Sequence, residues 1–423
     1  MLEDILDSNI AIDTHIMFQP LTPAFASNPY EVYARLRALK APYYFEDMNV
    51  HLLSRYKDVE AVARQGAMVR SLAAVMPEEF VLQEQKLANF HDMPNHEQLV
   101  QLSMLEQDGR HHRRLRMLVL REFSRQFVEK HRNMIQQYVD RLLTPLLEKR
   151  DIDFVAELAA HVPGHIIGNI LGVPDEDCPQ LRIWSENIVQ YFDADRTEVN
   201  KQLAESATTE FKDYLVRLIA ARENNPQDDL LSVLIAAKNA GELDETELIS
   251  LSLLILAGGH GSTIDVLGTG LLALLSHPDQ HKKLRSAPEL TGTAIHEMFR
   301  YDSPLPFFHR YASEPVEVMG RTYPKGTKFG LLYGSANRDP AQFPNADKFE
   351  IERAPNRHIA FGRGAHLCLG NNLARLDMEI IFKTLLDRTK DIQCDVDQAR
   401  YKPGLSARGL LELPVRLIPE SRP

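Results

Sequence analysis

A short glycine-rich segment carries the cysteine whose surroundings most favour chemistry. It runs from Phe361 to Gly370 as Phe-Gly-Arg-Gly-Ala-His-Leu-Cys-Leu-Gly and leads into a helical pattern over 371–386. Glycines permit positive φ angles, so main-chain N–H groups can approach the sulfur of Cys368 closely. Such donors, nearby positive charge and a helix start favour the thiolate, which suits an axial ligand of haem iron. The alternative is an inert buried cysteine in a turn, the more common fate of a free thiol.

This loop resembles the haem-binding signature of the cytochrome P450 family, Phe-Gly-x-Gly-x-His-x-Cys-x-Gly. The fixed positions of the signature are matched by Phe361, Gly362, Gly364, His366, Cys368 and Gly370. The resemblance implies haem b as cofactor, with Cys368 as the metal ligand and with Phe361 and Gly362 beside the ring. Haem-thiolate ligation favours cleavage of the O–O bond, so oxygen chemistry is expected.

Four further residues are expected to hold the haem propionates. The segment 108–116 resembles the family's His-x-x-x-Arg helix, in which His112 and Arg116 share one face at i, i+4 spacing. Two donors stacked in this way suit a carboxylate, although an ordinary solvated helix face would carry the same residues. The resemblance also assigns Arg310 and His358 to the propionates.

A long apolar helical run over 248–276 contains Gly258, Gly259 and Gly261. Glycines inside a helix cost about 0.5–1 kcal/mol each relative to alanine, which indicates that something packs closely against this backbone. In the family this helix crosses the haem face where O2 binds, and its groove carries an acid followed by a threonine. Counting back from His277 places Gly261 at the acid and Ser262 at the threonine, a departure from the family pattern.

The missing acid leaves several candidates for the proton relay that oxygen activation needs. Ser262 keeps a hydroxyl, Thr263 offers a second one and His260 is adjacent, so these three are the predicted catalytic residues. Asp265 lies a turn further along the same face, where a plain polar helix contact is the more common role. We expect Ser262 to matter most.

Supporting residues are predicted around this centre. Glu297 and Arg300 form a Glu-x-x-Arg pair at i, i+3 spacing, and the resemblance implies that an arginine from a later segment, Arg353, joins them. Their role would be to hold the cysteine loop. An apolar pocket for substrate is expected from core-type residues, with the tip at 405–410 touching the substrate; its lining residues are Leu256, Leu305, Phe307 and Phe308.

Length and composition favour one large domain over 1–423. The chain has 423 residues, 44% of them hydrophobic, and shows no linker or repeat. Its three cysteines form no disulfide or zinc pattern, which fits a reducing compartment. The first twenty residues lack a signal-peptide pattern, and no apolar stretch reaches the uninterrupted length of a membrane span. We therefore expect a cytoplasmic protein with no membrane anchor.

The expected fold is mainly α with a small β portion, similar to the triangular prism of helices around a buried haem that the P450 family forms. Helices are predicted over 30–39 and 56–65, with a strand pair over 43–54 between them. The segment 68–107 is irregular and polar, and is either a lid over the pocket or a plain surface loop. A small sheet is predicted over 316–332 and a terminal hairpin over 403–417.

Charge and motifs also bear on partners. The net charge of −11 argues against general nucleic-acid binding. Arg110, Arg113 and Arg114 are expected near the proximal surface, where they could steer an acidic ferredoxin. No G-x-G-x-x-G fingerprint for a flavin or nicotinamide is present, so electrons must come from outside.

The resemblance implies a monomeric monooxygenase. It would insert one oxygen atom from O2 into a mostly apolar small molecule, by hydroxylation or O-demethylation, with electrons from NAD(P)H through ferredoxin reductase and ferredoxin. Gly261 prompts two alternatives, a peroxide-driven peroxygenase and a non-oxygenating haem-thiolate enzyme such as an isomerase. The alternative from another class is a haem-thiolate ligand-binding or sensor protein without turnover.

Overall fold

The computed structural model describes residues 16–193 and 195–420. Residues 1–15, part of the segment in which no signal-peptide pattern was found, lie outside the described residues. Helices dominate the described chain, and short strands form a smaller β part, which confirms the predicted fold class.

The α-helices begin and end as follows: α1 Pro23–Ser27, α2 Tyr30–Ala38, α3 Tyr56–Arg64, α4 Glu78–Leu87, α5 Pro94–His96, α6 Gly109–Leu120, α7 Arg125–Val128, α8 Arg132–Lys149, α9 Val162–Leu171, α10 Cys178–Val189, α11 Glu198–Asn224, α12 Leu230–Asn239, α13 Glu245–Gly258, α14 Gly261–Leu275, α15 Pro278–Ser286, α16 Thr291–Tyr301, α17 Tyr333–Ala336 and α18 Asn371–Arg388. Local signals explain several starts. Thr197 and Asp229 cap α11 and α12, and Asp244 forms a capping box with Glu247 at α13.

The strands form four small sheets: β1 Tyr43–Phe45, β2 Val50–Leu53, β3 Met68–Val69, β4 Asp151–Asp153, β5 Phe307–Ala312, β6 Val316–Val318, β7 Arg321–Tyr323, β8 Lys328–Leu332, β9 Thr389–Gln393, β10 Arg400–Tyr401, β11 Leu410–Glu412 and β12 Pro414–Pro419. The largest sheet has the order β1-β2-β8-β5-β3. Its strand β5 pairs antiparallel with β8, Phe307 opposite Leu332 and Tyr311 opposite Lys328. The predicted strand pair and small sheet are therefore present as β1–β2 and β6–β7, with β8 joining the large sheet.

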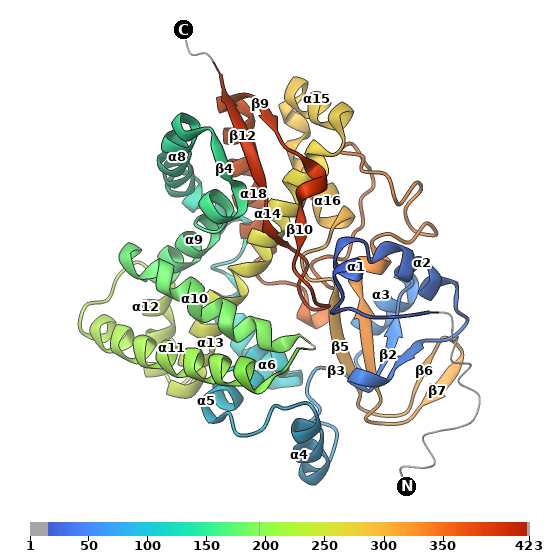
Figure 1. The fold of residues 1–423 in the computed structure, drawn as a ribbon. Coiled ribbons are helices and arrows are strands. Elements are labelled where there is room, and N and C mark those ends of the chain that lie inside the picture. The colour runs from blue at the N-terminus through green and yellow to red at the C-terminus, as the bar shows by residue number, and fades with distance from the viewer. Residues whose placement is uncertain (1–15, 194, 421–423) are drawn as a thin grey trace.

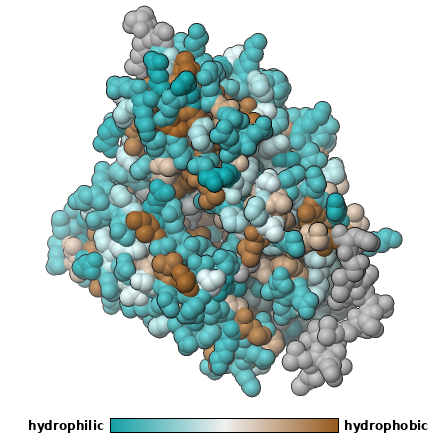
Figure 2. Space-filling view, in the orientation of Figure 1, coloured by the Kyte–Doolittle hydropathy of each residue, from teal (hydrophilic) through white to brown (hydrophobic). Residues whose placement is uncertain are grey.

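Helix-rich and strand-rich parts lie on opposite sides of the molecule (Figure 1). Helices α8 to α12 gather on one side, the five-stranded sheet with α1 to α3 lies on the other, and α14 runs between them. The largest hydrophobic cluster joins α13, α14, α16 and α18, whereas two smaller clusters pack on the sheet. The outer surface is mostly hydrophilic, with a recess near the middle of the face shown in Figure 2.

The long apolar run predicted over 248–276 is two helices rather than one. Helix α13 ends at Gly258 and α14 begins at Gly261, with His260 between them at φ −103° and ψ −76°. A Cβ at Gly259 would lie 2.9 Å from Cγ1 of Ile167, so α9 packs directly on this backbone. Residues Glu245–Leu275 are long and apolar enough to cross a membrane, but 72% of their most apolar window is buried inside the molecule.

Two terminal elements differ from the prediction. The hairpin is formed by β10 and β11, and the following strand β12 pairs with β4 and β9 instead. The reason is tertiary, because β12 satisfies its backbone groups on strands far away in the chain. The segment 68–107 contains the helix α4 and further short turns, so it is more ordered than an irregular loop.

Candidate active site

The cysteine loop is a tight turn between an extended segment and α18. The Cys368 N–H donates to the Phe361 carbonyl at 2.9 Å, and Gly362 and Gly364 have φ angles of 72° and 76°. A Cβ at Gly364 would lie 2.4 Å from the carbonyl oxygen of Ala63, so only glycine lets the loop approach α3. This geometry leaves Cys368 exposed at the end of the loop.

The electrostatics around the thiol have opposing parts. Although the Cys368 side chain has accessible surface, the protein packed around the thiol removes it from bulk water and raises its pKa above the ordinary value, while main-chain N–H groups of Gly370 and Asn371 and the charges of Arg116 and Arg375 act to lower the pKa. A metal ion that coordinates a thiol displaces its proton, and these donors then stabilise the resulting thiolate. The loop is therefore arranged for a bound metal centre more than for a free thiolate.

A group of nitrogen donors lies beside the loop. The rings of His112 on α6 and His366 in the loop have centroids 4.3 Å apart, and His366 Nε2 lies 3.0 Å from Asp108 Oδ1. Burial, with His366 and Arg116 nearby, lowers the pKa of His112 to about 4, so the ring is neutral. Arg116 extends from α6 to the loop, where Nη2 donates to the Leu367 carbonyl at 2.5 Å.

Two arginines complete this group. Arg310 on β5 is 3% exposed, and the one hydrogen bond of its guanidinium in the described chain goes to the His309 carbonyl. Arg70 is equally buried, and its Nε has no hydrogen-bond partner among the described residues. Buried donors without partners are costly, which indicates that an anionic group belongs here.

His358 does not join the other predicted propionate residues. Its Nε2 lies 3.0 Å from His296 Nδ1 on α16, and its ring lies parallel to Phe299 at 6.1 Å. His366 takes the place beside His112 instead. The signal for it was present in the sequence, because His366 is a fixed position of the loop signature and precedes Cys368 by two residues.

The Glu-x-x-Arg pair forms a fully buried network. Arg300 donates from Nε and Nη2 to the two carboxylate oxygens of Glu297 at 2.8 and 2.7 Å, and both residues are 0% exposed. Arg353 Nε lies 3.2 Å from both oxygens, and Asn356 donates to Glu297 at 3.0 Å. Helix α16 is thereby tied to the segment 344–356 that leads into the cysteine loop.

The predicted catalytic residues diverge at the α13–α14 junction. Ser262 is half-buried and Thr263 is 4% exposed. Apart from its chain neighbours and the adjacent backbone of α14, no atom of the described residues lies within 4 Å of a Cβ placed at Gly261. His260 is turned away, because its Nε2 lies 2.9 Å from the Cβ position of Gly164 on α9. Burial lowers the pKa of His260 to about 4. The prediction of a catalytic role for His260 is therefore not supported by its position.

Asp265 is also committed elsewhere. Its Oδ1 accepts a hydrogen bond from Lys402 Nζ at 2.8 Å, and a Cβ at Gly409 would lie 1.8 Å from the same oxygen. The ion pair holds the β10–β11 hairpin against α14. Asp265 therefore has the structural contact that the sequence left open as the alternative.

The predicted pocket residues are not all together. Phe307 is 6% exposed and packs in the sheet cluster with Leu52 and Leu332, so its assignment to the pocket is corrected to a core position. Strand alternation turns Phe308 to the other face, where Arg70 lies 5.2 Å from its ring centroid. Leu256 is buried on α13, and Leu305 is half-buried ahead of β5.

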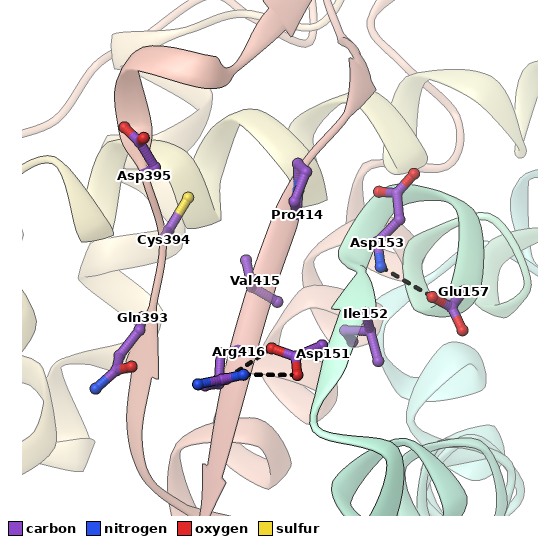
Figure 3. Close-up of a pocket in the computed structure, with 10 residues that line it drawn as sticks. All are labelled: Asp151, Ile152, Asp153, Glu157, Gln393, Cys394, Asp395, Pro414, Val415 and Arg416. Carbon is purple, nitrogen blue, oxygen red and sulfur yellow. Dashed lines mark hydrogen bonds and ion pairs between the residues drawn. The ribbon is translucent and has the colours of Figure 1, made fainter.

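A shallow groove elsewhere carries no comparable chemistry. It has a volume of about 560 Å³ and lies on the sheet of β4, β12 and β9, with Cys394 and several acids on its walls (Figure 3). Asp151 is paired with Arg416, and Glu157 accepts the Asp153 N–H at 2.9 Å. No group of metal-binding side chains occurs among the described residues, so we assign no site to this groove.

The donor set around Cys368 fits a haem. The exposed thiol would ligate the iron, and Arg70, whose Nε has no hydrogen-bond partner among the described residues, would supply donors for the haem carboxylates together with Arg310 and His112. The two carboxylates beside this group are both engaged: Asp108 accepts from the Arg70 N–H and lies against His366, and Glu106 forms an ion pair with Arg70.

Comparison with known proteins agrees with this geometry. The cytochrome P450 family model matches residues 62–400. The polyketide biosynthesis cytochrome P450 PksS of Bacillus subtilis (strain 168) is 36% identical over 412 residues, covering 95% of this chain and 99% of that protein. The biotin biosynthesis cytochrome P450 of the same strain is 33% identical, covering 92% and 96%. The solved structure of P450BioI in complex with hexadec-9Z-enoic acid ligated acyl carrier protein superposes with a TM-score of 0.86 at 33% identity, covering 93% and 100%. With this agreement between sequence, fold and cysteine loop, we conclude that the chain belongs to the cytochrome P450 family and is a P450 monooxygenase with haem b as its cofactor.

Proposed function

We propose that this protein inserts one oxygen atom from O2 into a mostly apolar small molecule, by hydroxylation or O-demethylation. The observation that carries the proposal is the exposed Cys368 at the end of a loop that only glycine at 364 permits. The test is the ferric absorption spectrum of the purified protein while terpenoids, aromatic ethers, fatty acids and polyketides are added. A saturable low-spin to high-spin change with one class identifies the substrate class. A spectrum without thiolate-haem character refutes the role of Cys368.

In this proposal the chain binds haem through residues from three elements. Cys368 would ligate the iron, Phe361 and Gly362 would contact the haem, and the propionates would be held by His112, Arg116, Arg310 and His366. When bound, haem supplies O2 binding and O–O bond cleavage. The neutral His112 and the buried arginines donate hydrogen bonds, and the arginine charges offset those of the propionates.

The hydroxyls of Ser262 and Thr263 are proposed to hold and pass protons during oxygen activation. Gly261 offers no acid, so water ordered by the Ser262 hydroxyl would deliver the protons. The half-buried position of Ser262 at the start of α14 supports this role. Neither His260 nor Asp265 is proposed, because His260 packs against Gly164 on α9 and Asp265 pairs with Lys402 of the hairpin.

Electrons are proposed to come from NAD(P)H through ferredoxin reductase and ferredoxin. Arg110 and Arg113 are exposed on α6, the helix that also contacts the cysteine loop, and Met117 is 62% exposed beside them. The charge of Arg114 is offset by an ion pair with Glu247, so Arg114 adds less positive charge to this surface. An acidic donor should therefore bind with a rate that falls as salt rises.

Two measurements separate this function from its rivals. Product formation that depends on ferredoxin and NAD(P)H supports the monooxygenase, whereas equal turnover with peroxide alone supports the peroxygenase that Gly261 suggested. A non-oxygenating isomerase would form product without either oxidant. Multiple turnovers with a reductant would exclude a haem-thiolate protein that only binds ligands.

A carrier-bound substrate is a second candidate for the substrate class. One structural neighbour is described in complex with an acyl carrier protein, and one relative is named for polyketide biosynthesis. For this protein, the test is to titrate the ferric spin state with a free acyl compound and with the same acyl group attached to a carrier protein.

We propose further that residues 1–423 form one domain, that the protein is a cytoplasmic monomer, and that it binds neither nucleic acid nor membrane. The acidic net charge and the cysteine pattern support these assignments. Size-exclusion chromatography with light scattering tests the monomer.

A further inference from the structure

A pair of histidines joins α16 to the turn that precedes the cysteine loop. His296 on α16 and His358 in the turn face each other, with His296 Nδ1 3.0 Å from His358 Nε2. His358 is 5% exposed and His296 is half-buried. Neither residue takes part in the proposed oxygen chemistry or in holding the propionates, so the contact between them calls for another role.

The proton positions of this pair follow from its neighbours. The Ala360 N–H donates to His358 Nδ1 at 3.4 Å, so that nitrogen carries no proton and the ring proton lies on Nε2. His358 Nε2 then donates to His296 Nδ1, which places the proton of His296 on its own Nε2. Burial lowers the pKa of both rings below the ordinary value of histidine, and Arg375 acts in the same direction on both. Both rings are therefore neutral at pH 7, and the bond between them has one direction.

Aromatic packing holds the His358 ring in the orientation that this bond requires. Phe299 lies three residues after His296 on α16, so both side chains share one face of the helix. The rings of Phe299 and His358 are nearly parallel, at 7° with their centroids 6.1 Å apart. The centroid of the Phe361 ring lies 4.4 Å from that of Phe299 and 5.8 Å from that of His358. Helix α16 thus fixes His358 and Phe361 together.

The turn also holds the main chain of the cysteine. The Phe361 carbonyl accepts the Cys368 N–H at 2.9 Å. Arg363 Nη2 donates to the His358 carbonyl at 2.8 Å, which fixes the start of the same turn. A displacement of His358 would therefore move Phe361 and, through its carbonyl, the backbone of Cys368.

The neighbouring ion-pair network reaches a different part of the chain. Glu297, the residue after His296, contacts Arg353 and Asn356, which precede the turn. His296 reaches the turn itself at His358. Two successive residues of α16 therefore fix two successive parts of the segment that leads to the cysteine.

We propose that His296 and His358 are positioning residues for the thiolate of Cys368. The inference rests on the proposed function, in which Cys368 ligates haem iron, and it assigns His358 a role through Phe361 rather than at a propionate. Loss of either ring leaves a buried polar atom of the other without its partner, which favours a displaced turn. The less restricted sulfur would more readily take up a proton from water, which weakens its bond to iron.

The test follows thiolate ligation in the haem-loaded protein. The absorption band of its ferrous–CO complex distinguishes a thiolate from a thiol ligand, and the decay of this band at pH 7 gives the rate of thiolate loss. We expect His296→Leu and His358→Leu each to raise this rate by about tenfold, as the loss of one buried hydrogen bond provides. The double leucine variant should raise the rate no further than either single change, because both remove the same bond. His296→Phe keeps a ring but offers no acceptor, so it should raise the rate equally and serves where a leucine variant does not take up haem.

Conservative variants separate positioning from general stability. His296→Asn places an amide oxygen near Nδ1 of the native ring, and His358→Gln places an amide nitrogen near Nε2, so both should keep the rate within about twofold of the wild type. Leu284→Ala, at a fully buried position on α15, should lower the free energy of unfolding in urea without changing the rate of thiolate loss.

Three results would each overturn the inference. They are a wild-type rate in the leucine variants, amide variants that lose the thiolate as fast as the leucine variants, and an equal rise in Leu284→Ala. In each case a normal thiolate band in the wild type leaves the monooxygenase function standing. A wild-type band of the thiol type would instead refute the ligand role of Cys368, and the inference with it.

Discussion

Ser262 is the residue at which this chain departs most clearly from its family. A serine stands in place of the threonine, and Gly261 in place of the acid before it. The structure removes two of the groups that could compensate, because His260 packs on α9 and Asp265 pairs with Lys402. The proton relay that we propose therefore depends on hydroxyls and water.

We predict that Ser262→Ala lowers coupling of electron use to product. Without the hydroxyl, water near Gly261 is less well ordered and reduced oxygen escapes as peroxide. The rate of coupled product formation should therefore fall by about 10²-fold to 10⁴-fold if Ser262 is the main donor. Product, peroxide and NAD(P)H consumption are measured together. Thr263→Val is the comparison at the neighbouring hydroxyl. Unchanged coupling and unchanged peroxide in Ser262→Ala would refute the role.

Glu297 is the residue on which the support of the loop depends. We predict that Glu297→Gln destabilises the protein by about 3–5 kcal/mol, because Arg300 and Arg353 are then left with buried charges that lack a carboxylate. Urea unfolding and haem content per chain are measured. Glu289→Gln, at an exposed position, should change neither. A Glu297→Gln variant as stable as the wild type would show that the network is dispensable.

At the scale of elements, the break between α13 and α14 is the feature that local propensity alone did not predict. Gly259 allows α9 to approach the backbone of the junction, with Ile167 in contact. The same junction presents Gly261 and Ser262 at the start of α14. Helix packing and the placement of the proposed proton donors are thus coupled.

We predict that Gly259→Ala costs about 1–3 kcal/mol, since its methyl group would lie within 2.9 Å of Ile167 Cγ1 and force the helices apart. The control is Gly292→Ala on α16, where no atom lies within 4 Å of the new Cβ. That change should be neutral or stabilise by about 0.4–1 kcal/mol. Chemical unfolding of both variants gives the comparison; equal stability of the two would contradict the packing argument.

At the scale of the whole molecule, buried neutral histidines connect stability to pH. His96 and His260 are 0% and 2% exposed, and burial lowers the pKa of each to about 4. In the unfolded chain histidine has a pKa of about 6.5, so the unfolded state binds protons first as the pH falls. Their contribution to stability is complete above about pH 6.5 and is lost progressively down to about pH 4.

We predict that the free energy of unfolding declines from pH 6.5 to pH 4, with each of these two histidines contributing roughly 3 kcal/mol over that range. His260→Gln should reduce the pH dependence of the unfolding free energy by the equivalent of about one bound proton. His111→Gln, at an exposed position, should leave this dependence unchanged. Urea unfolding at half-unit pH steps measures both. A pH-independent stability across this window would show that the histidines titrate normally.

The sequence by itself determined the family, the fold class and the cofactor, and it predicts Cys368 as the ligand. These follow from short-range requirements, since a glycine-bounded thiol and i, i+3 or i, i+4 pairs are set by residues close together in the chain. Glu297 and Arg300 are such a pair, and their contact is present in the structure. The departure at Gly261 was also visible without coordinates.

Only the tertiary structure decided which of several plausible side chains meet. His366 rather than His358 lies beside His112, Phe307 packs in the sheet core, and His260 turns to α9. The physical reason is that strand register and helix packing set these neighbours, and both depend on contacts between distant residues that no local pattern encodes.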